Sequence, residues 1–309
     1  MKFDVVCFGA LNVDKLYKVK RIAKAEEESI ILGFKESPGG SAANTAVGLA
    51  RLKVKTGYVG KVADDPEGQL LLKAFIDEGV DTRGIAISKG GRSGTVLGFI
   101  DEKGERALYV DPGVNDLIDF NEISLNYFAG SKFLHLTSFV GEKSSEAQIK
   151  LEENLLDTKV TLDPGEIYAK KGWFKMKPLI ESCYAVFPNE NELKLLTGKG
   201  YEEGAKQLMD AGVSVVAVKL GKRGCYVTDG LEKHLIKPYK VHVVDTTGAG
   251  DAFCAGFLYG LVRGEPLKHC GILGNFVASR CIMKIGAREG LPELEELPKN
   301  LDVVINNHL

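Results

Sequence analysis

The sequence predicts an α/β protein in which a mostly parallel β-sheet lies between two layers of helices. The first observation is that short apolar runs typical of buried strands alternate with stretches of helical periodicity. This alternation favours a parallel sheet, because each parallel connection needs a crossover, usually a helix. The second observation is that two segments break this rhythm with strand-like alternation and no helix. They predict a small second sheet outside the main one.

The expected elements follow in chain order. Strands of the main sheet are expected at 3–10, 55–62, 131–139, 158–164, 183–189 and 214–221, with a further strand-like run, VHVV, at 241–244. Helices are expected at 41–52, 67–78, 144–155, 189–197, 202–211, 250–263 and 266–284. We expect one domain over residues 1–309, because no linker or low-complexity tract divides the chain.

The two exceptional segments are residues 12–36 and 92–111. The stretch DEKGE at 101–105 is a hairpin-turn signal inside the second of them. We interpret the pair as a small β lid over a cleft; the alternative is a surface hairpin without function.

The composition excludes several classes of protein. The net charge is −2 and the isoelectric point about 6.3, so a nucleic-acid partner is not expected. The first residues lack the apolar core of a signal peptide, and no stretch is apolar enough to span a membrane. We therefore expect a cytoplasmic protein with no membrane partner. The six cysteines form no C-x-x-C pair, so zinc is not supported.

Polar loops follow several of the expected strands. They begin at Phe8, Pro188, Gly221 and Asp245. Ligands of open α/β sheets bind beyond the carboxyl ends of the strands, so these loops predict one shared site. The sequence contains no Walker-type P-loop and no G-x-G-x-x-G at the first helix, so another phosphate-binding device is required.

The stretch DTTGAGDAFCAGF at 245–257 offers such a device. Its glycines allow close backbone approach, and the start of a helix attracts an anion. Backbone N–H groups of Gly248, Ala249 and Gly250 would stabilise a phosphoryl group in transfer. Asp251 would then be either a cap of the helix or a base beside a bound phosphate.

These motifs resemble those of the ribokinase (PfkB) family of sugar and nucleoside kinases. DTTGAGDAFCAGF is similar to the family's C-terminal signature, and PGGSAANTAVGLARL at 38–52 to its N-terminal one. FPNENELKLLTG (187–198) resembles the family's N-x-x-E segment, and VKLGKRGCYV (218–227) its nucleotide-binding segment. The resemblance extends from residue 3 to about 292 and implies a three-layer α/β/α ribokinase-like fold.

The resemblance also implies roles for the phosphoryl-transfer residues. Asp251 would be the catalytic base, and the backbone of Gly248, Ala249 and Gly250 would form the anion hole. ATP would be the co-substrate, contacted by Lys219, Gly221 and Gly224. Asn189 and Glu192 would hold Mg²⁺, partly through water; the alternative for this pair is an ordinary polar first helical turn. Asp245 and Thr247 would bind a monovalent cation such as K⁺.

Acceptor-binding residues are implied in the first half of the chain. They are Asn12, Asp14, Gly39, Gly40, Asn44 and Arg106, and Asn115 is a weaker candidate. A carboxylate such as that of Asp14 accepts from two adjacent hydroxyls, which suits a sugar diol. Relatives often pair through their lids, so a homodimer through the lid is a further expectation.

Three readings of function are open at this point. The leading one is an ATP-dependent kinase acting on a primary hydroxyl of a small sugar such as ribose or fructose. A nucleoside kinase is the alternative, and Tyr17, Phe34 and Phe99 would either line its wider pocket or hold the lid together. The third is a silent metabolite-binding protein, against which Asp251 argues. The sequence leaves open which acceptor is used, whether the acceptor is already phosphorylated, and whether ADP replaces ATP.

Overall fold

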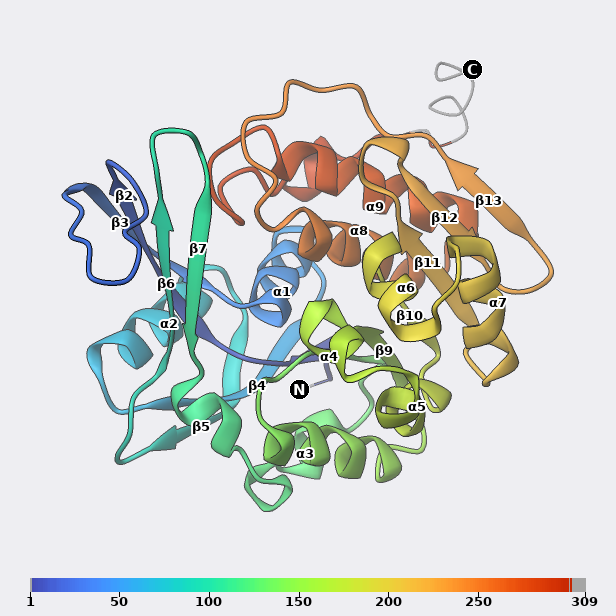
Figure 1. Cartoon of the computed structure of the whole chain (residues 1–309). Helices are drawn as coiled ribbons and strands as arrows, with labels where there is room; N and C mark the ends of the chain where they lie inside the picture. Colours follow the sequence, from blue (N-terminus) through green and yellow to red (C-terminus); the bar gives the residue numbers. More distant parts are fainter. Residues whose placement is uncertain (1, 300, 302–309) are drawn as a thin grey trace.

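The computed structural model describes residues 2–299 and 301, and its centre is a twisted nine-stranded sheet (Figure 1). The strand order is β13-β12-β11-β10-β9-β8-β1-β4-β5. All neighbours from β5 to β11 are parallel, while β12 and β13 extend the sheet in antiparallel fashion. The strands are β1 (Val5–Phe8), β4 (Thr56–Ala63), β5 (Asp81–Ser88), β8 (Phe133–Thr137), β9 (Lys159–Asp163), β10 (Ala185–Val186), β11 (Val215–Lys219), β12 (Cys225–Thr228) and β13 (Lys233–Ile236).

Helices cover both faces of this sheet. One layer contains α1 (Ser41–Arg51), α2 (Pro66–Asp77), α8 (Ala249–Arg263) and α9 (Leu267–Cys281). The other contains α3 (Glu142–Glu153), α4 (Gly165–Lys171), α5 (Trp173–Glu181), α6 (Glu190–Thr197) and α7 (Tyr201–Asp210). Short 3₁₀ helices are η1 (Gly113–Leu117), η2 (Phe120–Glu122), η3 (Leu125–Phe128), η4 (Gly221–Arg223) and η5 (Leu294–Glu296).

Strand β1 shows why two layers are needed. Its four side chains are fully buried, and successive side chains of a strand point to opposite faces. Val5 and Cys7 belong to the core under α1 and α8, whereas Val6 and Phe8 belong to the core under α3 to α7. A strand that is apolar on both faces is stable only between two helical layers.

A second sheet of four strands lies apart from the main one, at the upper left in Figure 1. Its order is β3-β2-β6-β7, with β2 (Asn12–Val19), β3 (Ile31–Gly39), β6 (Gly94–Ile100) and β7 (Arg106–Asp111). We call it the lid sheet. Residues 101–105 form the turn between β6 and β7, where the Asp101 carboxylate accepts the N–H groups of Lys103 and Glu105. The expectation from segments 12–36 and 92–111 is confirmed.

The lid sheet has a distinct aromatic face. In the register of its strands Tyr17 lies beside Phe34 and Phe99, with ring centroids 5.0 and 5.4 Å apart. Side chains alternate along a strand, so Tyr17 points away from the face that carries Asn12 and Asp14. The three rings therefore hold the strands of the lid together and do not line the face on which Asp14 lies.

The sequence missed several elements and misassigned one. All the expected strands of 3–221 and all the expected helices are present within a few residues. The missed elements are the edge strand β5, the pair β12–β13, and the short helices α4 and α5. The expectation of a strand at VHVV was wrong: residues 241–244 form a loop in which Val243 and Val244 are about half exposed. Within the described residues no helix is long and apolar enough to cross a bilayer.

Candidate active site

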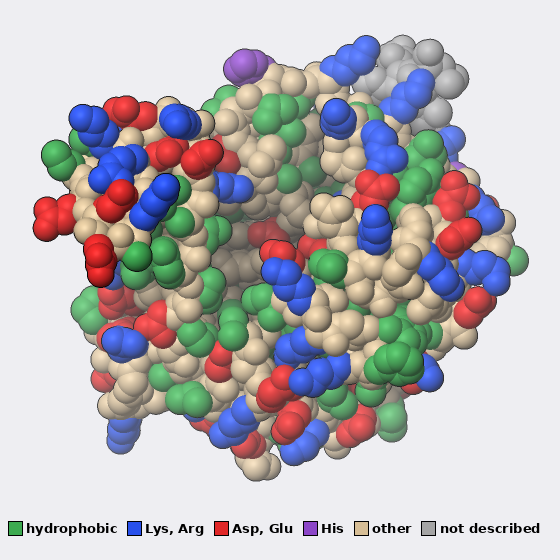
Figure 2. All heavy atoms as spheres, viewed as in Figure 1, with side chains coloured by type: hydrophobic (Ala, Val, Ile, Leu, Met, Phe, Trp, Pro, Cys, Tyr) green, Lys and Arg blue, Asp and Glu red, His purple; other side chains and the backbone are tan. Residues whose placement is uncertain are grey.

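A cavity of about 710 Å³ opens at the carboxyl edge of the main sheet. Thr137, Asp163 and Lys219, which line it, are the last residues of β8, β9 and β11. Figure 2 shows the surface hollowed between the lid sheet and the rest of the molecule, with acidic side chains inside the hollow. Of the four loops expected to share one site, those after residues 188, 221 and 245 contribute lining residues, whereas no residue of the loop at 8–14 lines the cavity.

Asp251 lies in the first turn of α8 and borders this cavity. The helix begins at Gly248, and no side chain caps it. The Asp251 carboxylate instead accepts a hydrogen bond from the Asn44 amide of α1, at 2.8 Å (Oδ2 to Nδ2). The Thr45 hydroxyl donates to the Asp251 carbonyl oxygen at 3.2 Å. The structure therefore does not support the reading of Asp251 as a helix cap.

The surroundings of Asp251 change its acidity. Burial raises its pKa to about 7, and the charge of Asp163 adds to this rise. The hydrogen bond from Asn44 and the charge of Lys219 act in the opposite direction. A carboxyl group with a pKa close to neutrality can both accept and release a proton under ordinary conditions.

The turn before Asp251 depends on glycine. Gly248 has a left-handed backbone (φ 76°), and a Cβ there would lie 2.6 Å from the Ala287 methyl group. An ideal Cβ on Gly250 would lie 3.3 Å from Lys219 Nζ, so the start of α8 faces that ammonium group. The Ala249 N–H donates to the Thr246 carbonyl oxygen at 3.2 Å. Ala249 also lines the cavity, but its own N–H group is already bonded to the backbone.

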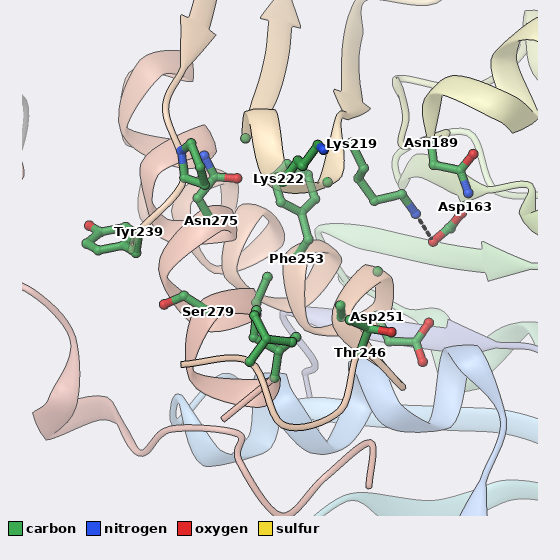
Figure 3. A pocket seen from close by; sticks show the side chains of 18 of the residues that line it. Asp163, Asn189, Lys219, Lys222, Tyr239, Thr246, Asp251, Phe253, Asn275 and Ser279 are labelled. Atoms are coloured by element: carbon green, nitrogen blue, oxygen red, sulfur yellow. Dashed lines mark hydrogen bonds and ion pairs between the residues drawn. The ribbon is translucent and has the colours of Figure 1, made fainter. Parts of the chain in front are cut away.

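Asp163 and Lys219 form a buried ion pair in the cavity (Figure 3). Lys219 Nζ lies 2.6 Å from Asp163 Oδ2, and the side chains are only 13% and 8% exposed. Burial is the largest single influence and lowers the pKa of Lys219, but the charges of Asp163, Cys254 and Glu192 and the hydrogen bond to Asp163 together raise it above its ordinary value. Lys219 belongs to one of the sequence motifs, whereas Asp163 lies outside all of them. Its place at the end of a buried strand, before Pro164-Gly165, was the available signal.

Asn189 and Glu192 form a capping box at the start of α6. The Asn189 N–H donates to Glu192 Oε2 at 2.7 Å, its amide donates to Oε1 at 2.6 Å, and Glu192 N–H donates to Asn189 Oδ1 at 2.9 Å. The pair therefore forms a polar first helical turn, which was the alternative interpretation of this motif. Both residues also line the cavity. Burial raises the pKa of Glu192 and the Asp163 charge adds to the rise, although Lys219 opposes it.

The loop from Lys219 to Gly224 passes along the same cavity. Gly221, Lys222 and Gly224 line it, and η4 occupies the middle of the loop. Gly224 has φ 88°, and a Cβ there would overlap the Ile236 carbonyl oxygen, so only glycine fits.

The far end of the cavity is apolar, and the sequence analysis did not find it. Figure 3 shows Tyr239, Asn275 and Ser279 at this end, away from the Asp163–Lys219 pair. The apolar residues that line the cavity are Val241, Val243, Phe253, Ala278 and Ile282. The α9 members recur at helical spacing, which in the sequence is indistinguishable from ordinary core packing. Val241 and Val243 of the VHVV run line the cavity as part of a loop. This position accounts for their apolar side chains without a strand.

The expected acceptor residues lie on the other side of Asp251. Asn44 connects the expected acceptor residues with the cavity, because its amide binds the Asp251 carboxylate. The residue is only 6% exposed. Gly40 has φ 103°, and a Cβ there would overlap the Ala10 carbonyl oxygen. A Cβ on Gly39 would overlap the Asp14 carboxylate. The two glycines thus bring β2, β3 and the start of α1 into contact.

Asn12 and Asp14 differ in their surroundings. Asn12 Oδ1 accepts from the Asn115 amide at 3.0 Å, and Asn115 is fully buried and bonded to Leu11, so Asn115 supports the site from behind. Burial raises the pKa of Asp14 to about 6, against the opposing charge of Arg288. No sequence motif pointed to Arg288.

Arg106 and Asp245 mark the edge of the site. Arg106 is exposed at the start of β7, and its charge contributes to lowering the pKa of Asp245. The strongest single influence on Asp245 is burial, which raises the pKa, but hydrogen bonds from Thr247 and Gly286 outweigh it. These bonds tie both carboxylate oxygens to the chain, at 2.8 to 3.0 Å.

Comparison with known proteins agrees with this geometry. The model of the pfkB family of carbohydrate kinases matches residues 2–294. An uncharacterized sugar kinase of Archaeoglobus fulgidus is 45% identical over 80% of this chain and 98% of its own length. An ATP-dependent ribose-1-phosphate kinase of Halopiger xanaduensis is 32% identical over 82% of this chain and 83% of its own length.

Solved structures show the same fold. Ribokinase from Thermotoga maritima superposes with a TM-score of 0.86 at 25% identity, covering 99% of this chain and all of that one. Arabidopsis thaliana ribokinase, solved with ribose and ATP, superposes with a TM-score of 0.84 at 25% identity, covering 96% of this chain and 97% of that one. The chain belongs to the pfkB family of carbohydrate kinases and has the ribokinase fold. It is a carbohydrate kinase.

The buried ion pair generates a testable prediction. Lys219→Met should lower the free energy of unfolding by about 3–5 kcal/mol, because it leaves Asp163 charged, buried and without its partner. Lys222→Met is the matched control: Lys222 lines the same cavity but makes no ion pair with any described residue, so its replacement should change stability by less than about 0.5 kcal/mol. Urea unfolding at pH 7 measures both. Equal stability of the two variants would contradict the buried pair.

Proposed function

We propose that the protein transfers the terminal phosphoryl group of ATP to a primary hydroxyl of a small sugar, with Asp251 as the general base. One observation carries this proposal. The Asp251 carboxylate borders the cavity at the start of α8, is held by Asn44, and is not used to cap its helix. A group with a pKa of about 7 at this position suits proton transfer at neutral pH.

On the acceptor side, the sugar would bind between the lid sheet and Asp251. Asn12 and Asp14 offer acceptors to its hydroxyls, and Gly39 and Gly40 let the backbone approach it. Asn44 and Arg106 complete the proposed acceptor set. Asp251 would accept the proton of the attacked hydroxyl, and the N-terminal turn of α8 from Gly248 to Gly250 would face the charge on the transferring group.

On the donor side, the phosphates of ATP would lie along Lys219, Gly221 and Gly224, and its base in the apolar end of the cavity. Two features support this arrangement. The cavity runs from charged groups to an apolar wall, as a nucleotide requires (Figure 3). Lys219 also lies between Asp163 and the first turn of α8, where a phosphate would meet both the ammonium group and the helix start.

Magnesium fits the donor set of this cavity. Asp163, Glu192 and Asp251 present carboxylates to it beside a single buried ammonium group, that of Lys219, and carboxylates and water are the ligands Mg²⁺ prefers. Asn189 and Glu192 would hold the ion, partly through water. Bound Mg²⁺ would neutralise charge on the phosphates.

Further expectations complete the proposal. We propose one kinase domain in the cytoplasm and a K⁺ site at Asp245 and Thr247.

We also propose a homodimer through the lid sheet. It is supported by exposed apolar residues on the strands of that sheet: Ile31, Leu32, Phe34, Leu108, Tyr109 and Val110.

A sugar is favoured over a nucleoside as acceptor. A nucleoside base would need a wide, aromatic pocket, but Tyr17, Phe34 and Phe99 pack against one another on the face away from Asp14. An ADP-release assay over pentoses, hexoses, their phosphates and nucleosides tests the proposal. Turnover should be confined to free or phosphorylated sugars. Turnover with nucleosides alone would refute the proposal of a sugar acceptor.

The role of Asp251 is tested by Asp251→Asn. Asparagine keeps the hydrogen bond from Asn44 but cannot take the hydroxyl proton, so turnover should fall by about 10²–10⁴. Burial holds the pKa of Asp251 above that of an ordinary aspartate, so its ionisation weakens the fold as pH rises through about 7. The variant should therefore be at least as stable as the parent at pH 8. Turnover within about tenfold of the parent, measured at saturating sugar and ATP, would exclude the base role.

The proposed metal role is tested by Glu192→Gln. Glutamine can still accept the Asn189 N–H and complete the capping box, so the start of α6 should be preserved. Its NH₂ group replaces the oxygen that accepts from the Asn189 amide, so the free energy of unfolding should fall by about 1 kcal/mol. Removing the carboxylate should raise the Mg²⁺ concentration for half-maximal activity by about tenfold, the effect of roughly one lost charged contact. The KM for sugar serves as the internal control and should change little. An unchanged Mg²⁺ titration would remove Glu192 from the metal site.

A further inference from the structure

Arg288 is a buried cation that no sequence motif singled out. It lies in the loop after α9 and is only 8% exposed. Its Nε donates to Asn44 Oδ1 at 2.8 Å, and the Asn44 Nδ2 donates to Asp251 Oδ2 at 2.8 Å. A continuous chain of hydrogen bonds thus runs from Arg288 through Asn44 to the carboxylate proposed as the base.

The direction of this chain depends on Arg288. A guanidinium group has only donors, so the side-chain oxygen of Asn44 must face it and the amide nitrogen must face Asp251. If the amide were reversed, two donors would meet at Arg288 and two acceptors at Asp251. A backbone carbonyl or a carboxylate in place of Arg288 would impose that reversed orientation. Arg288 therefore determines that Asp251 meets a donor.

A purely structural role explains Arg288 poorly. Its guanidinium makes no ion pair within 4.0 Å in the described part of the chain, and its Nη2 is buried without a hydrogen-bond partner. Burial lowers its pKa to about 10, although Tyr58, Glu78, Asp14 and Asp251 oppose this effect. A buried charge of this kind usually weakens a fold unless it is paired. Its contact with the Phe75 ring, 5.8 Å from guanidinium carbon to centroid, would be served by an apolar side chain as well.

We propose that Arg288 is a positioning residue for phosphoryl transfer: it orients Asn44, and Asn44 in turn fixes the Asp251 carboxylate. This rests on the proposed role of Asp251 as the base. Asn44 holds Oδ2, and the Ser41 side chain also hydrogen-bonds to the carboxylate. Loss of Arg288 would let the Asn44 amide rotate, so that the carboxylate would lose the Asn44 donor and the direction that this donor fixes.

Three substitutions separate the hydrogen bond of Arg288 from its charge. In Arg288→Gln the amide nitrogen stands at the chain position of Nε, so the donor to Asn44 is kept and the charge is lost. Arg288→Lys has a methylene at that position and keeps only the charge. Arg288→Met has neither, with similar bulk against Phe75. Arg51→Lys is not a suitable control, because Arg51 binds the carbonyl oxygens of Arg288 and Leu291. Arg83→Met serves instead, because Arg83 is an exposed arginine on edge strand β5 that does not line the cavity.

The expected order of kcat/KM for the preferred sugar is parent, then Gln, then Lys and Met. We expect Met to lose about 10²-fold, the cost of a small misplacement of a catalytic group, and Gln to recover most of that loss. The thermal midpoint of the Met variant should equal or exceed that of the parent, which a structural role would not allow. A Lys variant more active than Gln would overturn the proposal in favour of a charge contact with an anionic acceptor.

A second measurement does not need turnover. Carboxyl ¹³C NMR of aspartate-labelled protein follows the ionisation of Asp251 directly, with Asp251→Asn as the assignment control. Titratable or charged groups near it are Asp163, Lys219, Arg288, Tyr58, Cys254 and Cys281. Both variants lose the Arg288 charge, which by itself raises the pKa of Asp251. Because the Asn44 hydrogen bond also lowers that pKa, its loss should raise the pKa by about one unit more in the Met variant than in Gln.

The outcomes are distinguishable. If the parent enzyme phosphorylates no sugar, the proposed function fails, and the NMR comparison still decides whether Arg288 positions Asp251. If the parent is active but Met retains its kcat/KM and the pKa of Asp251, Arg288 is not a positioning residue.

Discussion

The contact between α1 and α8 is the constraint on which the candidate site depends. Gly48 and Ala255 let the two helices approach closely, since a Cβ on Gly48 would lie 2.7 Å from the Ala255 methyl group. At the adjoining ends of the same helices, Asn44 and Thr45 bind the side chain and the carbonyl oxygen of Asp251. Because α1 follows directly on β3 of the lid sheet, this contact also fixes where the lid begins relative to the proposed base.

Charge is the second constraint on the cavity. Three carboxylates, Asp163, Glu192 and Asp251, line it together with one deeply buried ammonium group, that of Lys219. Burial and mutual repulsion raise the pKa of Glu192 and Asp251, whereas Lys219 opposes the rise in both. In the proposed reaction this excess of negative charge suits Mg²⁺. It also explains why Asp251, rather than an ordinary surface aspartate, can act as a base that is partly protonated near neutrality.

The sequence predicted the fold well because alternation and glycine placement are local signals. The lid was found because strand periodicity without helices is visible in 12–36 and 92–111. Asp251, the proposed base, and its glycine turn were recognisable in the sequence because they form one contiguous motif. Asn275 and Arg288 were missed because long-range packing brings them to the site, and neither their spacing nor their neighbours differ from those of structural residues. For Asp163 the one local signal was its place at the end of a buried strand, before Pro164-Gly165. Asn189 and Glu192 were found in the sequence, but their spacing could not separate two roles: the pair caps α6 and also lines the cavity.

In the proposed mechanism the buried Asp251 carboxylate, whose pKa is about 7, accepts the proton of the sugar hydroxyl. The most direct measurement is the pH dependence of kcat/KM for the preferred sugar between pH 5 and 9. Asp251 should be protonated below about pH 7, so kcat/KM should fall about tenfold per pH unit there, and more steeply once Asp14 is protonated below about pH 6. A kcat/KM that stays constant down to pH 5 would contradict the account.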